Sequence, residues 1–390
     1  MNIYVTIIIS LIIFLFLFYK FYLIINYKFW ANQPIFHKIN LLYYILPNHI
    51  INTDLPKITR YCNFKDIKVN DIFKISDNRI SEIVSFLNNN FTQNKDDKLN
   101  FTNKIFMSYF QGNSNINFIG RYYHKDYDLK DNKFMIQNRL ISTLTTRNIN
   151  ITLNKEKLKA YYVDNLCVDK NHRKKNIAAT MIKTVEYKIR EKNSKIFIFL
   201  FKKEGIQEGI VPLCKFKIYQ FDINNYNINI NKQIRFIRLK KENFLDLVKF
   251  ITEKKELFKI WILPDLVNFE NLINNNIYQI YIKLDNNNNF ENIYILQNTN
   301  ITYKNIKSIE LVSSIITNVK NINDELMLII NYIRNDGFKF LNINEINNNI
   351  IILDKLSNIV KKYDYQIDCA YYLYNYKINQ FDKKDTFILI

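Results

Sequence analysis

The chain has 390 residues, of which 48% are hydrophobic, and it contains only five glycines and five prolines. This length is too great for one ordinary core and suits two similar domains. The formal net charge of +19 could serve a nucleic acid, an anionic lipid or an acidic small molecule. Because the lysines are scattered and no zinc-finger or base-stacking motif accompanies them, we expect no nucleic-acid partner. The four cysteines are widely spaced without a CxxC pair, which predicts reduced thiols and no metal site.

The first predicted element is an apolar helix at the start of the chain. Residues Ile3 to Ile25 are almost wholly apolar apart from Lys20, and the stretch has about the ~20 residues that a membrane span needs. A cleaved signal peptide is the alternative, but it requires a basic start and a small-residue cleavage site, and neither is present. Lys20, Lys28 and Lys38 lie towards or beyond the end of the stretch, and nothing basic precedes it. The positive-inside rule therefore predicts a single-pass membrane anchor over residues 1–26, with the rest of the chain on the cytoplasmic side.

The centre of the chain predicts a strand, a basic loop, a helix and a second strand. Residues 160–168 read AYYVDNLCV, a strand signal rich in aromatic and β-branched residues, and residues 169–176 read DKNHRKKN. Apolar residues then recur at helical spacing, and residues 195–201 read KIFIFLF, which predicts the next strand. The recurring apolar residues of the helix are Ala178, Met181, Ile182, Val185 and Ile189.

The basic loop stands where this helix begins, which makes it a candidate anion site. Backbone N–H groups are unpaired at the start of a helix and the helix dipole is positive there, so a pyrophosphate is favoured. Arg173, Lys174 and Lys175 add positive charge for a 3′-phosphate. The arrangement is typical of the CoA-binding core of the GNAT acyltransferase class. The alternative is a solvated turn that binds nothing.

The same region resembles a more specific pattern. Residues 163–183 read VDNLCVDKNHRKKNIAATMIK and are similar to the signature of the N-myristoyltransferase family. Ordinary GNAT acetyltransferases require glycine where Asn176 stands, whereas the myristoyltransferase pattern has no glycine there. The positions that match the signature are Leu166, Cys167, Val168, Lys170, Arg173, Lys175, Ala178, Ile182 and Lys183.

Four further landmarks resemble that family, in the same order along the chain. Residues 27–34 read YKFWANQP and lie directly after the apolar stretch, where the family carries a segment that contacts acyl-CoA. Residues 87–101 are similar to a family segment whose acidic run helps to hold the basic residues of a peptide. Residues 337–356 and the run YYLYN at 371–375 match further family segments, and the chain ends on the apolar residues FILI.

The resemblance implies an α/β fold in which two tandem GNAT-like halves share a twisted mixed sheet, preceded by one transmembrane helix. It implies that residues 27–225 bind acyl-CoA and that residues 226–390 complete the peptide-binding groove. It also implies a monomer whose partners are acyl-CoA, proteins with an N-terminal glycine, and the membrane.

The resemblance further implies an activity and a mechanism. The family transfers myristate from myristoyl-CoA, a co-substrate rather than a permanent cofactor, to the N-terminal glycine amine of a protein. Its general base is the carboxylate at the end of the chain, which is Ile390 here. Backbone N–H groups in a strand bulge stabilise the oxyanion, and the matching positions are Asn165 and Leu166.

The remaining site residues follow from the same resemblance. The residues implied for binding the peptide are Asp164, Phe91, Asp96 and Asp97. The residues implied for binding acyl-CoA are Tyr27, Phe29, Trp30, Leu166, Cys167, Val168, Arg173, Lys174, Lys175, Asn176, Ile177, Ala178 and Ala179.

The peptide side departs from the family pattern. Residues 201–206, FKKEGI, lack the threonine of the family's corresponding segment, and residues 361–367, KKYDYQI, lack the glycines of a family loop. Two alternatives therefore stay open, namely an N-acetyltransferase of the GNAT type and a non-catalytic membrane protein that binds acyl-CoA or peptide.

Overall fold

The fold is that of a computed structural model, which describes residues 3–92, 94, 96–130, 133–224, 234–359 and 363–390. The predicted boundary between the two halves, at residues 225 and 226, lies outside the described residues. So does the start of the glycine-free segment 361–367.

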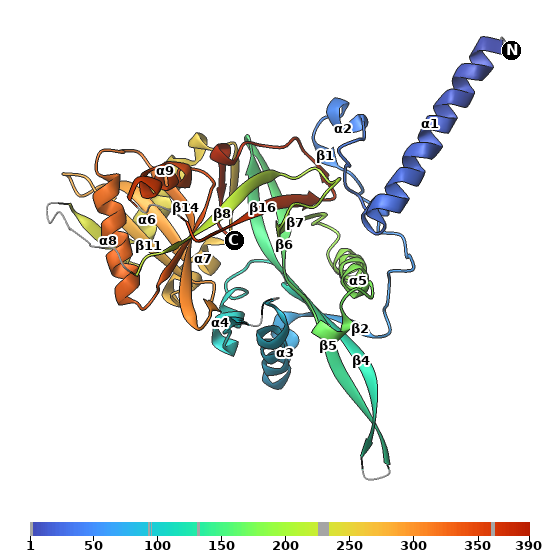
Figure 1. The fold of residues 1–390 in the computed structure, drawn as a ribbon, viewed down its shortest axis with the longest axis horizontal. Helices are drawn as coiled ribbons and strands as arrows, with labels where there is room; N and C mark the ends of the chain where they lie inside the picture. The colour runs from blue at the N-terminus through green and yellow to red at the C-terminus, as the bar shows by residue number, and fades with distance from the viewer. Residues whose placement is uncertain (1–2, 93, 95, 131–132, 225–233, 360–362) are drawn as a thin grey trace.

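The predicted apolar helix is present as α1 (Ile3–Tyr27), and it projects away from the body of the molecule (Figure 1). Its apolar side chains are exposed, and Leu23 is its one fully buried residue. Twenty-five residues at ~1.5 Å each make a helix long enough to cross a bilayer core. Within the described chain, α1 alone has the length and apolar composition for a membrane span.

A single large mixed sheet forms the centre of the protein, as the α/β prediction requires, and a pair of short strands, β1 (His49–Ile50) and β17 (Tyr376–Lys377), lies apart from it. The sixteen strands described in the large sheet are β2 (Ile67–Asp71), β3 (Asp97–Leu99), β4 (Phe118–Lys130), β5 (Lys133–Leu153), β6 (Glu156–Val168), β7 (Ile198–Glu204), β8 (Cys214–Asp222), β9 (Phe236–Arg238), β10 (Ile260–Leu263), β11 (Tyr278–Leu284), β12 (Phe290–Gln297), β13 (Ile301–Tyr303), β14 (Ile306–Ile316), β15 (Phe340–Asn344), β16 (Tyr365–Tyr374) and β18 (Thr386–Ile388).

Helices cover both faces of the sheet. Leu140 and Ile141 are neighbours on β5 and therefore point to opposite faces. Leu140 joins the core under α3, and Ile141 joins the core under α5. α5 lies so close to β4 that any side chain at Gly120 would collide with Val185. The helices besides α1 are α2 (Leu42–Ile45), α3 (Asp77–Asn90), α4 (Asn103–Ser108), α5 (Ile177–Lys192), α6 (Phe244–Glu253), α7 (Leu266–Asn274), α8 (Ile322–Asn335) and α9 (Asn349–Ile359).

The predicted strand, loop, helix and strand of the central motif are confirmed as β6, α5 and β7, with β6 and β7 parallel. The second strand begins at Ile198 rather than at residue 195. A matching unit, β14, α8 and β15, occurs later in the chain, and β14 and β15 are also parallel. Two copies of one strand–helix–strand unit are what two GNAT-like halves predict.

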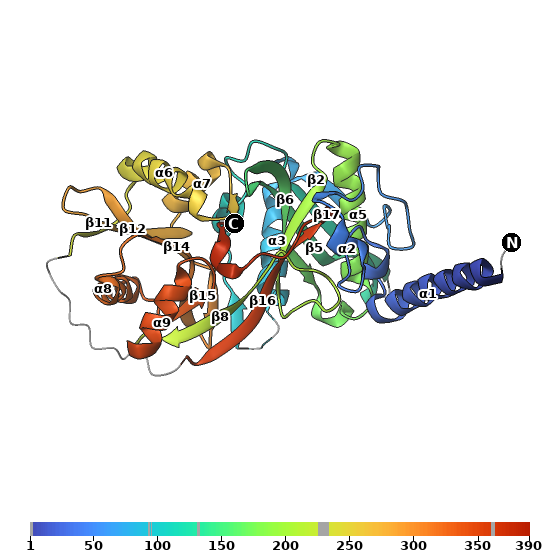
Figure 2. The same cartoon turned by 90° about the horizontal axis from the view of Figure 1, so that it is seen from above.

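The two halves exchange strands, so the sheet does not divide where the sequence does. β16, near the end of the chain, lies between β7 and β8, and β8 in turn pairs with β15. On the other side of the first unit, β10 pairs with β5 and carries β18 as its parallel partner. The last strand of the chain therefore lies in the middle of the molecule (Figures 1 and 2).

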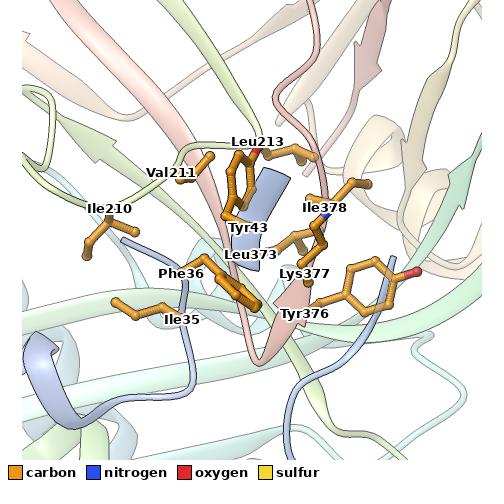
Figure 3. Close-up of a pocket in the computed structure, with 10 residues that line it drawn as sticks. All are labelled: Ile35, Phe36, Tyr43, Ile210, Val211, Leu213, Leu373, Tyr376, Lys377 and Ile378. Atoms are coloured by element: carbon orange, nitrogen blue, oxygen red, sulfur yellow. The ribbon is translucent and has the colours of Figure 1, made fainter. Parts of the chain in front are cut away.

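The segment that follows α1 is fixed to the body of the protein. Ile35, Phe36 and Tyr43 pack against the end of β16 and against the loop before β8 (Figure 3). The gap left between these side chains measures only about 10 Å³, roughly the space for one water molecule. This pocket is therefore a packing seam and no ligand site. The helix α1 consequently leaves the body from a firmly attached segment.

Candidate active site

One cavity of about 1810 Å³ runs between the two halves. It is larger than the ~300–1,000 Å³ of ordinary small-molecule sites, which suits a protein with two large substrates. Its walls include the end of β6, the start of α5, parts of β7, β12, β14 and β16, and the last residue of the chain.

Most of the site residues expected from sequence line this cavity. Three of them do not: Tyr27, Lys175 and Asp96 are absent from its lining. The ring of Tyr27 stacks on His37 instead, with centroids 5.0 Å apart, while Lys175 and Asp96 are exposed to solvent. The expected residues that do line the cavity are Phe29, Trp30, Phe91, Asp97, Asp164, Asn165, Leu166, Cys167, Val168, Arg173, Lys174, Asn176, Ile177, Ala178, Ala179 and Ile390.

The expected bulge is present in β6. In the pairing with β5, Cys167 lies opposite Thr143, while Asp164 lies opposite Thr145. Asn165 and Leu166 therefore occupy the irregular stretch, and Asn165 has a left-handed backbone with φ of 51°. Asparagine tolerates this conformation better than most residues. A backbone donor depends little on its side chain, but the backbone angle gives a physical reason for asparagine at this position.

The carboxylate of Asp164 occupies one of the backbone donors of the bulge. Its Oδ1 accepts a hydrogen bond from the backbone N–H of Asn165 at 2.8 Å. The side chain of Asn165 in turn donates to Thr145 Oγ1 at 2.9 Å. The Asn165 N–H is thus occupied by a neighbouring carboxylate, so it can reach an oxyanion only when that carboxylate turns away.

The basic loop between β6 and α5 is organised by Asp169. This buried carboxylate accepts hydrogen bonds from the Asn171 N–H at 2.9 Å and from His172 Nδ1 at 3.0 Å, and it pairs with Arg139 at 3.0 Å. Burial by itself would raise the pKa of Asp169, but the hydrogen bonds from His172 and Asn171 and the charge of Arg139 hold it below its usual value. The loop therefore has a fixed shape at neutral pH.

The loop leads directly into the start of α5. Lys174 and Asn176 both have left-handed backbones, with φ of 63° and 60°, and Asn176 is the N-cap residue of the helix. The first turn of α5 contains no acidic residue. Arg173 donates from Nη2 to the Asn90 carbonyl at 2.6 Å, which ties the loop to the end of α3. The free positive end of α5 and the cations beside it are suited to bind an anion.

The end of the chain is held inside the cavity by three contacts. The Leu389 N–H donates to the Ile262 carbonyl at 2.9 Å, and Ser313 Oγ donates to the Ile388 carbonyl at 3.1 Å. The Tyr278 hydroxyl donates to an oxygen of Ile390 at 3.0 Å. Ile390 is 8% exposed and lines the cavity.

Two charged residues in the cavity were missed by the sequence reasoning. Lys202 of β7 and Glu310 of β14 form an ion pair at 3.1 Å across the two halves, and Asn344 donates to the same Glu310 oxygen at 2.7 Å. Burial disfavours the charge on Lys202, but Glu310 outweighs that effect and raises the pKa of Lys202 well above its usual value. The only sequence signal was indirect: Lys202 lies in the segment that lacks the family's threonine.

Cys167 lies beside the bulge but is not suited to be a nucleophile. Burial raises the pKa of its thiol to about 12, so the reactive thiolate is scarce at neutral pH. Within the described residues, no group of three histidine, cysteine, aspartate or glutamate side chains is placed to hold a metal ion. The chemistry that this site offers is therefore acid–base and hydrogen-bond chemistry around the bulge and the chain end.

Comparison with known proteins agrees with this geometry. Residues 50–204 match the family model for the N-terminal domain of myristoyl-CoA:protein N-myristoyltransferase. No curated protein matches the chain in sequence.

Solved structures of one enzyme match almost the whole fold. A structure of Saccharomyces cerevisiae N-myristoyltransferase with bound myristoyl-CoA is 14% identical, with a TM-score of 0.67, covering 92% of this chain and 94% of that one. A second structure of that enzyme, with bound myristoyl-CoA and inhibitors, is also 14% identical, with a TM-score of 0.69 and coverage of 93% and 94%. At this identity the likeness establishes the shared fold. Residues 50–204 therefore match the N-terminal domain of the N-myristoyltransferase family, and the fold of the chain agrees with that of an N-myristoyltransferase.

Proposed function

We propose that this protein transfers myristate from myristoyl-CoA to the N-terminal glycine amine of a protein. The observation that carries the proposal is that the β6 bulge, the start of α5 and Ile390 all line one cavity. These are an oxyanion site, an anion site and a carboxylate, which together are the parts that acyl transfer from a CoA thioester needs.

The acyl-CoA would lie along the first half. Its pyrophosphate would meet the start of α5, with Arg173 and Lys174 beside it, because both residues line the cavity there. Phe29 and Trp30 contact each other, with ring centroids 5.1 Å apart, and line the same cavity, so they would cover part of the bound acyl-CoA. The structural relatives in yeast hold myristoyl-CoA, which supports this ligand.

The reaction begins with deprotonation of the peptide's ammonium group. An α-amino group has a pKa of only ~7.7–8.0, so the loss of its proton costs little free energy near neutral pH and needs only a modest base. The Ile390 carboxylate would take that proton. The amine lone pair then attacks the thioester carbonyl carbon, a C–N bond forms and the C–S bond breaks. CoA leaves as the thiolate and takes up the second proton from the nitrogen.

The oxyanion formed in this attack would be bound by the N–H groups of Asn165 and Leu166. Loss of one such donor typically costs about 2.7–4 kcal/mol of barrier. Asp164 now accepts the Asn165 N–H, and it also lines the cavity. When the peptide ammonium arrives, the Asp164 carboxylate would turn to it and release the Asn165 N–H for the oxyanion. Asp164 would thus couple peptide binding to completion of the oxyanion site.

Phe91 and Asp97 also line the cavity and would contact the peptide. Both halves of the cavity come from one chain, so a monomer is sufficient. We further propose that α1 anchors the protein in a membrane with the catalytic part in the cytoplasm, where CoA thioesters are made. Deletion of residues 3–27 should then move the protein from the membrane fraction to the soluble fraction while transfer is retained.

The proposal is tested with the full chain in detergent. Equal amounts of myristoyl-CoA and acetyl-CoA are offered with peptides that begin in Gly, Ala or Ser, and mass spectrometry reads which peptide gains which group. Myristate on glycine peptides alone is the expected result. Transfer of acetate would establish an acetyltransferase instead. Binding of acyl-CoA without any transfer would establish a binding platform.

A further inference from the structure

A second buried cation faces the cavity beside the Lys202–Glu310 pair. Arg147 lies on β5, directly opposite Tyr162 of β6, and is only 2% exposed. Its guanidinium carbon is 5.0 Å from the ring centroid of Tyr109 and 5.2 Å from that of Tyr162. Arg147 lines the cavity, yet its Nε and Nη1 atoms have no hydrogen-bond partner.

The two tyrosine rings cannot satisfy the guanidinium by themselves. Cation–π contacts stabilise the charge over the ring faces. The N–H bonds, however, point outward in the plane of the guanidinium, in a fork that matches a carboxylate. A buried donor without an acceptor is unfavourable, and more so when it carries a charge. The N–H donors in the plane of the Arg147 guanidinium therefore still need an anionic acceptor.

Other buried cations of the described chain differ from Arg147. Lys202 is paired with Glu310, and Lys183 is paired with Glu186 at 2.9 Å. Arg190 also has unpartnered nitrogens, but its Nη2 donates to the Asp54 carbonyl and it does not line the cavity. Arg147 thus combines burial, unpartnered donors and access to the cavity.

Two of the carboxylates that line the cavity are already engaged with other groups. Glu310 accepts from Lys202 and Asn344, and Asp164 accepts from the Asn165 N–H. Among the residues that the structure describes, no carboxylate forms an ion pair with Arg147. A bound molecule can therefore supply the anion that Arg147 lacks.

Arg147 belongs to the peptide side of the cavity. Burial raises the pKa of Tyr109 to about 12, and the nearby charge of Arg147 reduces this rise. Its charge also acts on Tyr278, the residue that donates to Ile390. An anion on Arg147 would therefore lie close to the place where the amine would be activated.

We infer that Arg147 is a specificity-determining residue that binds the carboxylate of an Asp or Glu side chain close to the N-terminal glycine of the acceptor protein. This inference rests on the proposed function. It replaces a preference for basic peptides with a preference for acidic ones, set by one buried guanidinium.

The test measures peptide binding to the full chain in detergent, loaded with a thioether analogue of myristoyl-CoA that cannot transfer its acyl group. Hexapeptides beginning in Gly carry Asp or Glu, or the matched Asn or Gln, at one of positions two to six. We expect roughly tenfold or greater tighter binding of the acidic peptide at one of these positions. Arg147→Met should remove the preference, and Arg147→Lys, which keeps the charge, should retain part of it.

Several results would overturn the inference. Equal binding of acidic and amide peptides by the unmodified protein would do so even if the variants failed to fold. A preference that survives Arg147→Met would also do so. Arg147→Met could instead slow transfer to acidic and neutral peptides equally and shift the pH profile of transfer. Arg147 would then act on the Ile390 carboxylate and would not bind the substrate. Carboxylate-dependent binding without any turnover by the unmodified protein would contradict the proposed function but support this inference.

Discussion

The protein contains the same backbone unit twice, and the two copies differ at the start of their helices. In both β6–α5–β7 and β14–α8–β15, a helix joins two parallel strands, and the first strand carries an irregularity in its pairing. The first turn of α5 has no acidic residue, whereas that of α8 has Asp324 and Glu325. Glu325 is fully buried and accepts hydrogen bonds from Asn292 at 2.9 Å and Tyr294 at 2.6 Å.

The difference shows that backbone geometry alone does not make an anion site. Both helices present a positive dipole at their start. In the second unit, a carboxylate of the helix itself lies there, so a phosphate would meet a negative charge. The irregularity of β14 lies beside Ser313, whose Oγ donates a hydrogen bond to the Ile388 carbonyl. In the second unit, the irregular strand therefore contacts the end of the chain. In the proposed mechanism, the first unit would bind a CoA phosphate, and the second would position the carboxylate that accepts the proton of the amine.

Removal of the chain end tests whether the two units have these different roles, and it should have the largest effect, on kcat. Deleting Leu389 and Ile390 should lower kcat by about 10²–10⁴-fold, the usual contribution of a general base. Affinity for myristoyl-CoA should not change, because the other unit binds the phosphates. Kinetics and calorimetry measure the two quantities separately. Addition of two glycines after Ile390 is the matched control, since it keeps the side chain but moves the carboxylate, and it should give the same loss. Full activity after the deletion would contradict the role of the chain end.

The ion pair that joins the two units should have the next largest effect, on stability. Lys202→Met leaves Glu310 buried without its cation and should lower the free energy of unfolding by about 3–5 kcal/mol. The double variant Lys202→Met with Glu310→Leu should recover most of this loss, because no charge remains buried. Denaturant titration measures both.

A surface pair provides the control for this experiment. Lys259 pairs with Asp385 at 2.6 Å but is 61% exposed, so Lys259→Met should change the stability by roughly 0–1 kcal/mol. If the double variant were as unstable as Lys202→Met alone, the pair would not be the source of the effect.

The cations before the two helices allow a direct comparison of the starts of α5 and α8. Lys174 precedes α5 and Lys320 precedes α8. Lys174→Ala should weaken binding of myristoyl-CoA by roughly tenfold, with the loss shrinking at high salt. Lys320→Ala should leave the affinity unchanged. Equal effects of the two substitutions would mean that general positive charge, and not the start of α5, attracts the substrate.

The smallest expected effect is on the pH dependence of stability. Its sign should differ between Asp169, beside the first unit, and Glu325, in the second. The pKa of Asp169 is lowered in the folded protein, so its stabilising contribution is present above the usual value of 3.8 and is lost as the pH falls. Asp169→Asn should therefore cost stability near neutrality, with the cost shrinking in acid.

Glu325 should behave in the opposite way. Burial raises its pKa above the usual 4.5, so the folded state binds the proton more tightly than the unfolded chain does. Its contribution is most favourable below 4.5 and is lost as the pH rises. Glu325→Gln should remove this decline. Melting temperatures across the acid range would measure how the stability difference between each variant and the unmodified protein changes with pH. A change of the same sign in Asp169→Asn and Glu325→Gln would contradict the opposite pKa shifts of the two carboxylates.

The local units of the fold were predictable from the sequence because their signals are local. β6 follows from a run of aromatic and β-branched residues, α5 from helically spaced apolar residues, and α1 from an almost wholly apolar run. The N-myristoyltransferase resemblance extended the prediction to the shared mixed sheet. The predicted strand from residue 195 in fact begins at Ile198, because a short turn follows α5 and only later residues pair with β6.

The candidate site was only partly predictable, for a reason that concerns distance along the chain. Motif positions such as Leu166 and Arg173 lie in one short segment and were found together. Lys202 and Glu310 come from different halves, and neither belongs to a motif. Likewise, Arg147 reads as one more scattered cation in a basic chain until Tyr109 and Tyr162 close around it.

The sequence by itself determined the apolar N-terminal helix, the strand–loop–helix core with its basic loop, and the resemblance to the N-myristoyltransferase family. These depend on periodicity and on motifs within short segments, where side-chain order dictates local structure. Only the tertiary structure decided that β8 and β16 are exchanged between the halves and that Ile390 lines the same cavity as the β6 bulge. It alone also paired Asp164 with the Asn165 N–H and left Arg147 without an anion. Burial and hydrogen bonding between distant segments set these features, because the free energy of a buried charge depends on partners that the linear chain does not bring together.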